Sequence, residues 1–431
     1  MQQSSTGQRT HKRWFPILGL VVMATLINYM DRSILGIAAP YMSKELNIDT
    51  IDLGWLFSAF FTVYAFTQIP AGIFLDRFGV RLTYFLALTL WSLTTVAQGF
   101  SRGFQMLSGL RMTLGVFEAP CFPANSRILA TWFPQHERAR ANGIYAVGQY
   151  AGQGLLSVPL FWITSELGWR SLFYVVGALG IAFGFIWFRF YRDPQHYNGV
   201  NQAELAHIEA GGGLAPKGER TPFSWKNVAY LLRQRQIIGA SLGQFAGNSG
   251  LAFFITWFPS YLANERHMEW IMAGFFAAFP FLAAAAGVLL GGLLSDLLLK
   301  ATGSANFARK LPVVSGLLLL STITAANFVA PDDNITVIAI LSIAYFGQGL
   351  TNLGWTVISD VAPKKLIGLT GGIFNFITGI AAILTPLVIA YAYHATKSYY
   401  VPLAYIGVVA LLGVLSYVFI LGDVKRLPEP E

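Results

Sequence analysis

Two related stretches decide the fold expected of this sequence. Residues 72–81 read Gly-Ile-Phe-Leu-Asp-Arg-Phe-Gly-Val-Arg, and residues 292–296 read Gly-Leu-Leu-Ser-Asp. Both contain the pattern Gly-x-x-x-Asp, and each comes at the end of a long apolar segment, the second such segment of the chain and the eighth. A pattern that returns after six segments predicts two halves related by an internal repeat.

The composition around these stretches is that of a polytopic membrane protein. Of the 431 residues, 55% are hydrophobic and 12% are charged, and the mean hydropathy is +0.54. A soluble domain carries about 25% charged residues, so this chain lacks the charge for a mostly solvated surface. Because Cys121 is the sole cysteine, a disulfide-stapled secreted scaffold is excluded as well.

Twelve segments approach the length of about 20 apolar residues that a membrane-spanning helix needs. We therefore expect an all-α membrane protein with twelve transmembrane helices in two six-helix halves. The expected spans are roughly 14–36, 53–75, 82–100, 103–125, 141–164, 170–189, 237–262, 271–298, 312–330, 335–358, 367–392 and 399–421.

The basic residues predict the orientation of these spans. If the N-terminus is cytoplasmic, the cytoplasmic segments hold 22 of the 29 Lys and Arg residues and the opposite segments hold five. This asymmetry follows the positive-inside rule and places both termini in the cytoplasm of a multi-pass inner-membrane protein. The basic charge is thereby explained by topology, so nucleic-acid binding is not expected.

Residues 190–236 differ from the other connections because they are polar and rich in Gly and Pro. We expect a cytoplasmic linker between an N-terminal half, 1–189, and a C-terminal half, 237–431. The stretch 201–209 is expected to form a short surface helix. A plain tether and a regulatory element remain equally open for this linker.

Four charged residues fall deep inside expected spans: Asp31, Arg32, Arg111 and Glu118. A charge in the membrane is costly and usually faces a cavity or a partner. Arg111 and Glu118 are two helical turns apart, so each is expected to meet a residue of another span. One hypothesis is a neutral cluster that locks two helices together. The other gives the arginine to a substrate carboxylate and the acids to protons.

Uncharged polar residues recur on several spans, among them Tyr29, Tyr64, Gln149, Trp355 and Asn375. Their distribution predicts a polar cavity lined by spans 1, 2, 4, 5, 7, 10 and 11, with spans 3, 6, 9 and 12 facing lipid. A single amide in a span is often interhelical glue. Amides, phenols and an indole together suit a polyhydroxylated solute.

The stretch 72–81 resembles the signature loop of the major facilitator superfamily, which lies between the second and third of twelve helices. The resemblance implies a gate loop made by Gly72, Asp76, Arg77, Gly79 and Arg81. In it the glycine would allow close helix approach, and the charged side chains would form contacts across the cytoplasmic gate.

Further stretches are similar to the anion:cation symporter branch of that superfamily, above all to bacterial transporters of sugar acids such as galactonate and glucarate. They are residues 28–32, 110–120, 122–127, 131–134 with Glu137 and Arg138, 371–375 and 422–426.

This resemblance assigns roles to individual residues. It implies proton coupling by Asp31 and Glu118, with Arg111 as a supporting charge. It implies a sugar-acid site formed by Tyr29, Arg32, Tyr64, Gln149, Trp355 and Asn375.

The expected function is import of an aldonate or aldarate by proton symport, through alternating access, in a monomer surrounded by lipid. Another organic anion, such as a hexuronate or an aromatic carboxylate, is the alternative substrate. An integral-membrane enzyme is disfavoured because the sequence has no nucleophile elbow, no P-loop and no metal-ligand spacing. No cofactor or metal is expected besides the coupling proton.

Overall fold

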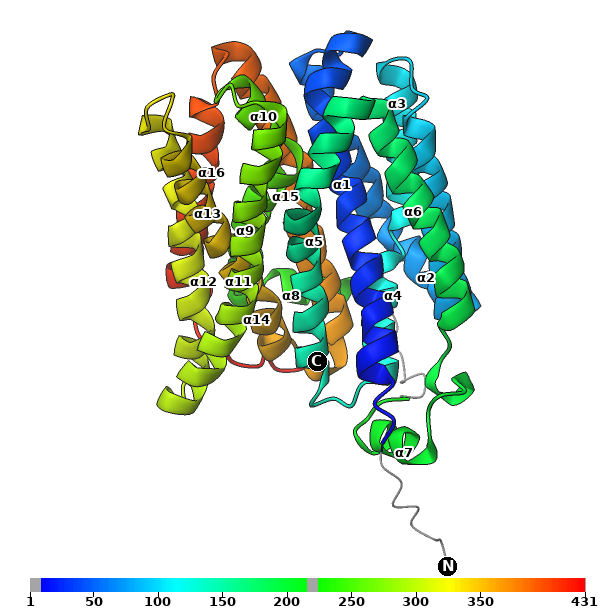
Figure 1. The fold of residues 1–431 in the computed structure, drawn as a ribbon. Helices are drawn as coiled ribbons and strands as arrows, with labels where there is room; N and C mark the ends of the chain where they lie inside the picture. Colours follow the sequence, from blue (N-terminus) through cyan, green and yellow to red (C-terminus); the bar gives the residue numbers. More distant parts are fainter. Residues whose placement is uncertain (1–8, 215–223, 431) are drawn as a thin grey trace, which may run out of the picture.

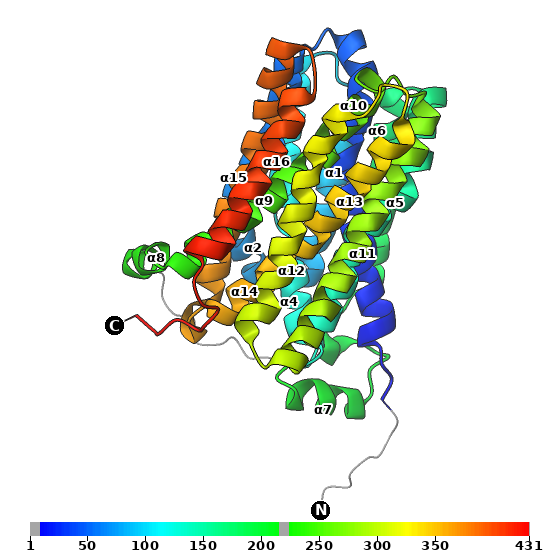
Figure 2. The same cartoon turned by 90° about the vertical axis from the view of Figure 1, so that its left-hand side faces the viewer.

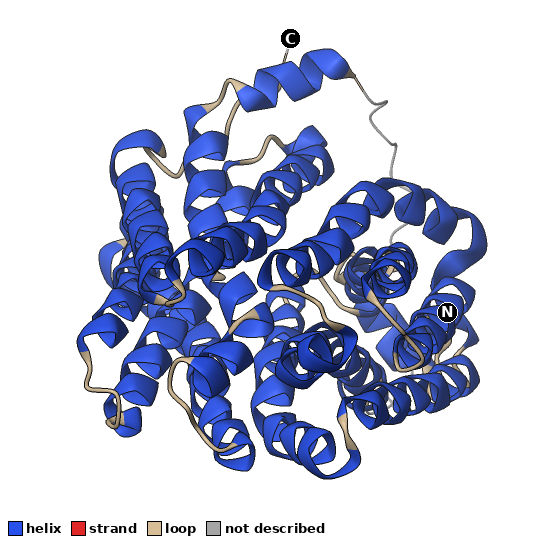
Figure 3. Ribbon diagram, turned by 90° about the horizontal axis from the view of Figure 1, so that it is seen from above, coloured by secondary structure: helices blue, strands red, loops and turns tan. Residues whose placement is uncertain are grey.

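The computed structural model describes residues 9–214 and 224–430, and every regular element in these ranges is helical (Figure 1). Seen along the bundle in Figure 3, the long helices stand side by side. The α-helices are α1 (Leu18–Leu46), α2 (Thr50–Gln98), α3 (Phe104–Glu118), α4 (Cys121–Trp132), α5 (Arg138–Leu167), α6 (Trp169–Phe190), α7 (Gln202–Ala210), α8 (Trp225–Leu232), α9 (Arg235–Thr256), α10 (Phe258–Asn264), α11 (Trp270–Thr302), α12 (Ala305–Ser321), α13 (Asn334–Thr351), α14 (Gly354–Val361), α15 (Ile367–Thr396) and α16 (Tyr400–Leu415). Shorter 3-10 and π-helical turns cover Arg13–Ile17, Pro194–His196, Thr322–Phe328, Lys364–Leu366 and Ser416–Ile420.

All twelve expected spans are helical. Within the described residues, nine helical stretches are long and apolar enough to cross a membrane. The other three expected spans are formed by α3 with α4, by α5, and by α9 with α10. Two of these spans are each divided between two helices, and all three carry many polar side chains, so they do not count as long apolar helices. Polar side chains are expected on spans that face other helices and not lipid.

Gly79 separates two spans that are otherwise one helix. α2 runs from Thr50 to Gln98, and within it Gly79 has φ +76° and ψ 169°. A side chain is strongly disfavoured in this region, so glycine is required here. The first glycine of the loop pattern, Gly72, differs from the expectation of a close helix approach, because a Cβ there would meet no atom within 4 Å. In this conformation Gly72 mediates no close helix approach.

The helices α1–α6 form an N-terminal group, and α9–α16 form a C-terminal group. The two groups pack closely at one end of the bundle. The first and last described residues lie at the lower end in Figure 1, which we call the terminal end; the opposite end is the distal end. In the distal part, a Cβ on Gly36 of α1 would lie 2.6 Å from the carbonyl oxygen of Ile255 in α9, and one on Gly274 of α11 would lie 2.6 Å from Cβ of Phe161 in α5. Such contacts leave no room for any side chain larger than hydrogen.

At the terminal end, glycines of the helices that join the two groups have open space beside them. A Cβ placed on Gly72 of α2, Gly143 of α5, Gly292 of α11 or Gly371 of α15 would meet no atom within 4 Å. The helices α2, α5, α11 and α15 also form the main contacts between the two groups. The structure is therefore closed at the distal end and open between these helices at the terminal end.

Candidate functional site

A buried ion pair joins α1 to α3. The Arg32 Nε atom lies 2.6 Å from Oε1 of Glu118, and the two side chains are 7% and 0% exposed. Glu118 is the last residue of α3, and Pro120 stands between it and the start of α4 at Cys121. Proline supplies no backbone N–H, so the helix is interrupted directly beside the carboxylate. Glu118 thus meets a partner from another span, as the sequence predicts.

Aromatic rings surround the Arg32 guanidinium. Its carbon Cζ lies 4.7 Å from the ring centre of Tyr64, 5.1 Å from that of Tyr29 and 5.2 Å from that of Phe60. Cation–π attraction of this kind holds the charged group in place. Among the described side chains, no hydrogen-bond acceptor reaches the second terminal nitrogen of Arg32. Tyr29, Arg32, Tyr64 and Glu118 therefore form one cluster, which we call the Arg32 cluster.

Asp31 is held by residues that the sequence analysis did not single out. Its Oδ2 accepts a hydrogen bond from Nε1 of Trp91 at 2.9 Å, and its Oδ1 accepts one from the Thr95 hydroxyl at 2.9 Å. Both donors lie in the second part of α2, the third expected span, and both are fully buried. One face of this span, which is expected to face lipid, therefore holds Asp31, while Leu82, Leu90 and Leu93 of the same span are exposed. The available signal was the spacing of Trp91 and Thr95, four residues apart on one helix face.

Arg111 lies beside the Arg32 cluster without joining its ion pair. The side chain is 1% exposed, and its Cζ lies 4.8 Å from the ring centre of Phe60, the ring that Arg32 also contacts. Nε and Nη1 of Arg111 have no hydrogen-bond acceptor among the described side chains. Arg111 is therefore a second buried cation next to the first.

The remaining predicted site residues lie on other helices. The Nδ2 atom of Asn375 in α15 donates to Oε1 of Gln68 in α2 at 2.7 Å, which links the two groups of helices one turn away from Tyr64. Trp355 in α14 is 40% exposed and packs edge-on against Phe374. Gln149 in α5 is buried. Among the described contacts, none joins Gln149 or Trp355 to the Arg32 cluster.

A small, mostly apolar cavity lies between α1, α5, α9, α10 and α11. From α1 it is lined by Met30, Ser33 and Ile37, which share a helix face different from that of Arg32. The Ser33 hydroxyl accepts a hydrogen bond from Nε2 of Gln153 at 2.8 Å. This cavity is separated from the ion pair by the body of α1.

The charged residues of the expected gate loop bind within their own group of helices. Asp76 of α2 pairs with Arg127 of α4 at 3.0 Å. The Nε and Nη2 atoms of Arg81 both donate to the carbonyl oxygen of Phe188 in α6. Arg77 lies over the ring of Phe78, its neighbour in the chain. In the described part of the chain, these side chains thus have contacts inside the N-terminal group.

The repeat stretch behaves in the same way. Arg309 of α12 lies 3.0 Å from Asp360 of α14 and 3.7 Å from Asp296 of α11. The two related loops thus share a pattern in which the acid of the Gly-x-x-x-Asp motif meets an arginine of its own group.

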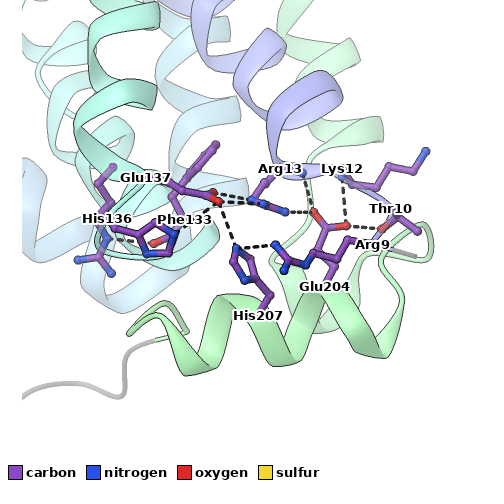
Figure 4. A network of polar contacts seen from close by, with 10 residues as sticks. Arg9, Thr10, Lys12, Arg13, Phe133, His136, Glu137, Glu204 and His207 are labelled. Atoms are coloured by element: carbon purple, nitrogen blue, oxygen red, sulfur yellow. Dashed lines mark hydrogen bonds and ion pairs between the residues drawn. The ribbon is translucent and has the colours of Figure 1, made fainter. Parts of the chain in front are cut away.

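Figure 4 shows a polar network at the terminal end, where α7 meets the start of the chain. Arg13 binds both oxygens of Glu137, at 2.7 and 3.0 Å, and also Oε1 of Glu204 at 3.0 Å. The Thr10 hydroxyl donates to the other oxygen of Glu204. Burial raises the pKa of Glu137, but hydrogen bonds from Arg13 and His207 outweigh it and hold that pKa at about 2. The network fixes α7 to the N-terminal group of helices.

His136, Glu137 and His207 place one possible metal-ligand atom each within 4.8 Å of one another. The Arg13 guanidinium, however, occupies both oxygens of Glu137 and would repel a cation there. Glu137 is therefore engaged as the acceptor of an ion-pair network.

The chain resembles known transporters over nearly its full length. It is 44% identical over 423 residues to the D-galactonate transporter of Escherichia coli O6:H1, covering 96% of this chain and 97% of the relative. It is 41% identical over 437 residues to the probable galactarate/D-glucarate transporter of Escherichia coli K12, covering 98% and 96%. It is 31% identical over 407 residues to the probable sulfoacetate transporter of Cupriavidus necator, covering 94% and 93%.

A solved structure shares the fold. The inward-facing, occupied form of a bacterial homologue of the human lysosomal transporter Spinster superposes with a TM-score of 0.73 at 18% identity, covering 98% of this chain and 100% of that one. The family model of the Major Facilitator Superfamily matches residues 21–386. The named relatives are transporters, which agrees with the expectation that the chain is not an enzyme. With this match and the all-helical bundle, the chain belongs to the Major Facilitator Superfamily.

Proposed function

We propose that this protein imports a sugar acid, an aldonate or an aldarate, by proton symport through alternating access. The Arg32–Glu118 pair carries the proposal, because it places a carboxylate-binding group against an acid in a buried site. The relatives named as D-galactonate and galactarate/D-glucarate transporters support the substrate class. A buried ion pair is an expensive way to hold two helices together, which favours a functional role over a purely structural one.

The terminal end is proposed to face the cytoplasm. The positive-inside distribution of Lys and Arg supports this orientation. With it, the conformation described here is open to the cytoplasm and closed to the outside. The proposed division is an N-terminal half, 1–189, a cytoplasmic linker, 190–236, and a C-terminal half, 237–431.

The substrate carboxylate is proposed to bind Arg32 in place of Glu118. An arginine offers a planar pair of donors that matches a carboxylate. When the substrate takes this fork, Glu118 loses its counter-charge, and its neutral, protonated form is favoured. Binding of the anion and uptake of a proton are thereby linked through one guanidinium group. Proton coupling by Glu118 with Asp31 completes the proposed scheme.

The rest of the site is proposed to bind the hydroxyl groups of the substrate. Tyr29 and Tyr64 already border the Arg32 guanidinium, while Asn375 contacts α2 through Gln68. Gln149 and Trp355 would join this group when the halves close around the substrate. In the cluster, Arg111 remains a second buried cation, which gives an aldarate a possible partner for its second carboxylate. An aldonate is favoured if Arg111 is neutralised by an acid.

Uptake by purified protein in proteoliposomes tests the proposal. An inward proton gradient is expected to drive accumulation of galactonate or glucarate above the outside concentration. Hexuronates and aromatic carboxylates serve as competitors, and stronger competition by either would shift the substrate assignment to that anion. Facilitated equilibration without gradient-driven accumulation would refute symport.

The number of protons is tested in the same vesicles by current measured on a solid-supported membrane. A monoanion that enters with two protons, one on Asp31 and one on Glu118, carries net positive charge inward. Robust uptake of a monoanion without charge movement would reduce the count to one proton.

A further inference from the structure

Two arginines at the terminal end meet at one backbone oxygen. The carbonyl oxygen of Phe188, in the last turn of α6, accepts from Nε and Nη2 of Arg81 at 3.0 and 2.8 Å. It also accepts from Nη1 of Arg192 at 2.9 Å, and the same nitrogen donates to the Tyr191 carbonyl. The two guanidinium groups, one from α2 and one from the chain that follows α6, are thereby brought side by side. We call them the arginine pair.

Capping of the helix end explains only part of this arrangement. The last carbonyl groups of a helix have no partner within it, and the helix end carries about half a unit of negative charge. One arginine is enough to meet that charge, but Arg81 and Arg192 bring two full positive charges to it. A carbonyl oxygen has two lone pairs, whereas three N–H groups converge on that of Phe188. The arginine pair therefore keeps an excess of positive charge and of hydrogen-bond donors.

The acids near the arginine pair in the sequence have other contacts. Asp76, the acid of the loop pattern, pairs with Arg127. Asp193 follows Arg192 directly, but its Oδ1 atom accepts a hydrogen bond from a tyrosine hydroxyl. Among the described residues, no ion pair joins Arg81 or Arg192 to a carboxylate. Two like charges held together without a counter-charge repel each other, so the pair is suited to receive an anion from outside the chain.

The surface of the bundle beside the arginine pair is apolar. α6 packs against α1, α2 and α5, and Figure 1 shows it on the side of the molecule away from α12 and α16. In Figure 2, which is seen from the side of those two helices, α6 lies further from the viewer than they do. Phe185 of α6 is 60% exposed and Ile186 is 45% exposed, and Leu82, directly after Arg81, is exposed as well. An apolar surface of this kind is suited to contact with acyl chains when the bundle spans a bilayer.

Aromatic rings join this apolar surface to the arginine pair. The Phe85 ring lies 4.8 Å from that of Phe188 and 5.7 Å from that of Phe185. The Cζ atom of Arg81 lies 4.1 Å from the ring centre of Phe188. Arg189, four residues after Phe185 on α6, adds a further exposed base. A molecule that fits here has an anionic end at the arginines and an apolar part along the rings.

We propose that the arginine pair binds the phosphate of an anionic membrane lipid in the leaflet at the terminal end. The phosphate accepts from the remaining N–H groups of Arg81 and Arg192, and an acyl chain lies along Phe85 and Phe185. The planar guanidinium fork matches phosphate oxygens, and basic sites between membrane helices bind lipid headgroups. A soluble phosphate has the same charge but no apolar part, so the rings favour a lipid. The site is separate from the Arg32 cluster and does not depend on the proposed function.

Native mass spectrometry of the full-length protein in detergent tests the site. The probe is phosphatidylglycerol, and phosphatidylcholine with the same acyl chains is the comparison, because its choline cation is repelled by the arginines. Arg192→Gln is expected to weaken binding of the first phosphatidylglycerol about fivefold, the contribution of one base near a membrane surface. Arg192→Lys keeps the charge and is expected to weaken it less. Lys300→Gln, an exposed base in the last turn of α11, is the matched control and leaves the affinity unchanged.

Thermal unfolding provides a second measurement and a check of folding. The unfolding temperature in detergent without lipid shows whether each variant is folded. Added phosphatidylglycerol raises this temperature when it binds the folded protein. The rise is expected to be smaller in the Arg192→Gln and Arg81→Gln proteins than in the Lys300→Gln protein, whereas phosphatidylcholine is expected to act equally on all of them.

Three outcomes overturn the proposal. Equal weakening by Arg192→Gln and Lys300→Gln would show that phosphatidylglycerol is attracted by surface charge in general. Unchanged affinity in both the Arg192→Gln and Arg81→Gln proteins would leave the pair as a cap of α6. Displacement of phosphatidylglycerol by an equal concentration of glycerol phosphate or inorganic phosphate would show that the site takes a soluble anion and not a lipid.

Discussion

At the scale of single residues, the shape of the Arg32 guanidinium decides the chemistry of the site. We predict that Arg32→Lys reduces sugar-acid uptake by two orders of magnitude or more, because a point charge cannot replace the planar fork; about 3 kcal/mol corresponds to a factor near 100. Initial uptake rates in proteoliposomes measure the effect. For uptake of an aldonate, which has a single carboxylate, Arg111→Lys is the matched control, since Arg111 is also buried but has no ion-pair partner among the described residues. Near-normal affinity in the Arg32→Lys protein would leave Arg32 as a structural partner of Glu118.

The hydroxyl of Thr95 is the second feature at this scale. Thr95→Val keeps the side-chain shape but removes the hydrogen bond to Asp31. We expect a loss of about 1 kcal/mol of stability, the typical net value of a hydrogen bond, seen as a lower temperature of thermal unfolding in detergent. Thr94→Val is the control, because the Thr94 hydroxyl donates to the backbone of its own helix. A double-mutant cycle with Asp31→Asn isolates the pair; additive losses would contradict a direct interaction.

Sequence reasoning identified the charged residues of the site but not all their partners. Asp31, Arg32 and Glu118 stand out because charges are rare in apolar spans, and Arg32 does meet Glu118. Trp91 and Thr95 escaped notice because indoles and hydroxyls are common in spans that face lipid. Rotation of a helix about its axis depends on packing against its neighbours, which one sequence does not specify.

At the scale of elements, the contacts of α7 give a prediction for acid pH. The folded-state pKa of Glu137 is about 2, below its usual 4.5, so its contribution to stability is complete above about pH 4.5 and is lost as the pH falls toward 2. The difference of about 2.5 pH units corresponds to about 3 kcal/mol. Glu137→Gln is therefore expected to lower thermal stability at pH 7 and to speed hydrogen exchange in Gln202–Ala210.

The pH series provides the decisive comparison for Glu137. The stability difference between Glu137→Gln and the parent protein should shrink between pH 4.5 and pH 2. Glu209→Gln, at an exposed position on α7, is expected to behave as the parent does throughout. A difference that stays constant with pH would show that the amide disturbs α7 for steric reasons.

Helix boundaries were predictable where the chain carries a clear signal. The expected helix at 201–209 corresponds to α7, because Asn201 accepts from the backbone N–H of Glu204 and begins the helix. The interruption at Pro120 follows from the missing N–H of proline. The near-continuous α2 did not follow from the sequence, since the turn is confined to the single residue Gly79.

At the scale of the whole molecule, closely packed glycines mark the end that must open. Leucine at Gly36 would collide with the Ile255 carbonyl, so Gly36→Leu is expected to disfavour the conformation described here and to expose the distal interface. Ser58, whose hydroxyl binds the Ile383 carbonyl across that interface, provides a reporter. Ser58→Cys in a Cys121→Ser background should react faster with an impermeant thiol reagent added from outside when Gly36→Leu is present.

A second glycine gives the opposite result. Leucine fits at Gly72 in this conformation but would hinder closure of the terminal end, so Gly72→Leu should stop uptake without raising the reactivity at position 58. Gly19→Leu is the control on α1, because a Cβ there meets no atom within 4 Å. Equal reactivity at position 58 in the Gly36→Leu and Gly72→Leu proteins would contradict this account of the two ends.

The attachments of α7 and α8 have a consequence for how the molecule can be divided. α7 is fixed by Glu204 to the start of the chain, whereas α8 is fixed by Leu231 to the helices that follow it. The helices before the linker and those after it thus each carry their own portion of the connecting segment. Two separate polypeptides, one ending after α7 and one beginning before α8, would each keep the contacts of their portion. Their assembly would rest mainly on the intramembrane surfaces of α2, α5, α11 and α15, with α1 packed against α9 and α10. The covalent connection would then matter for bringing the partners together during biogenesis, not for their shape.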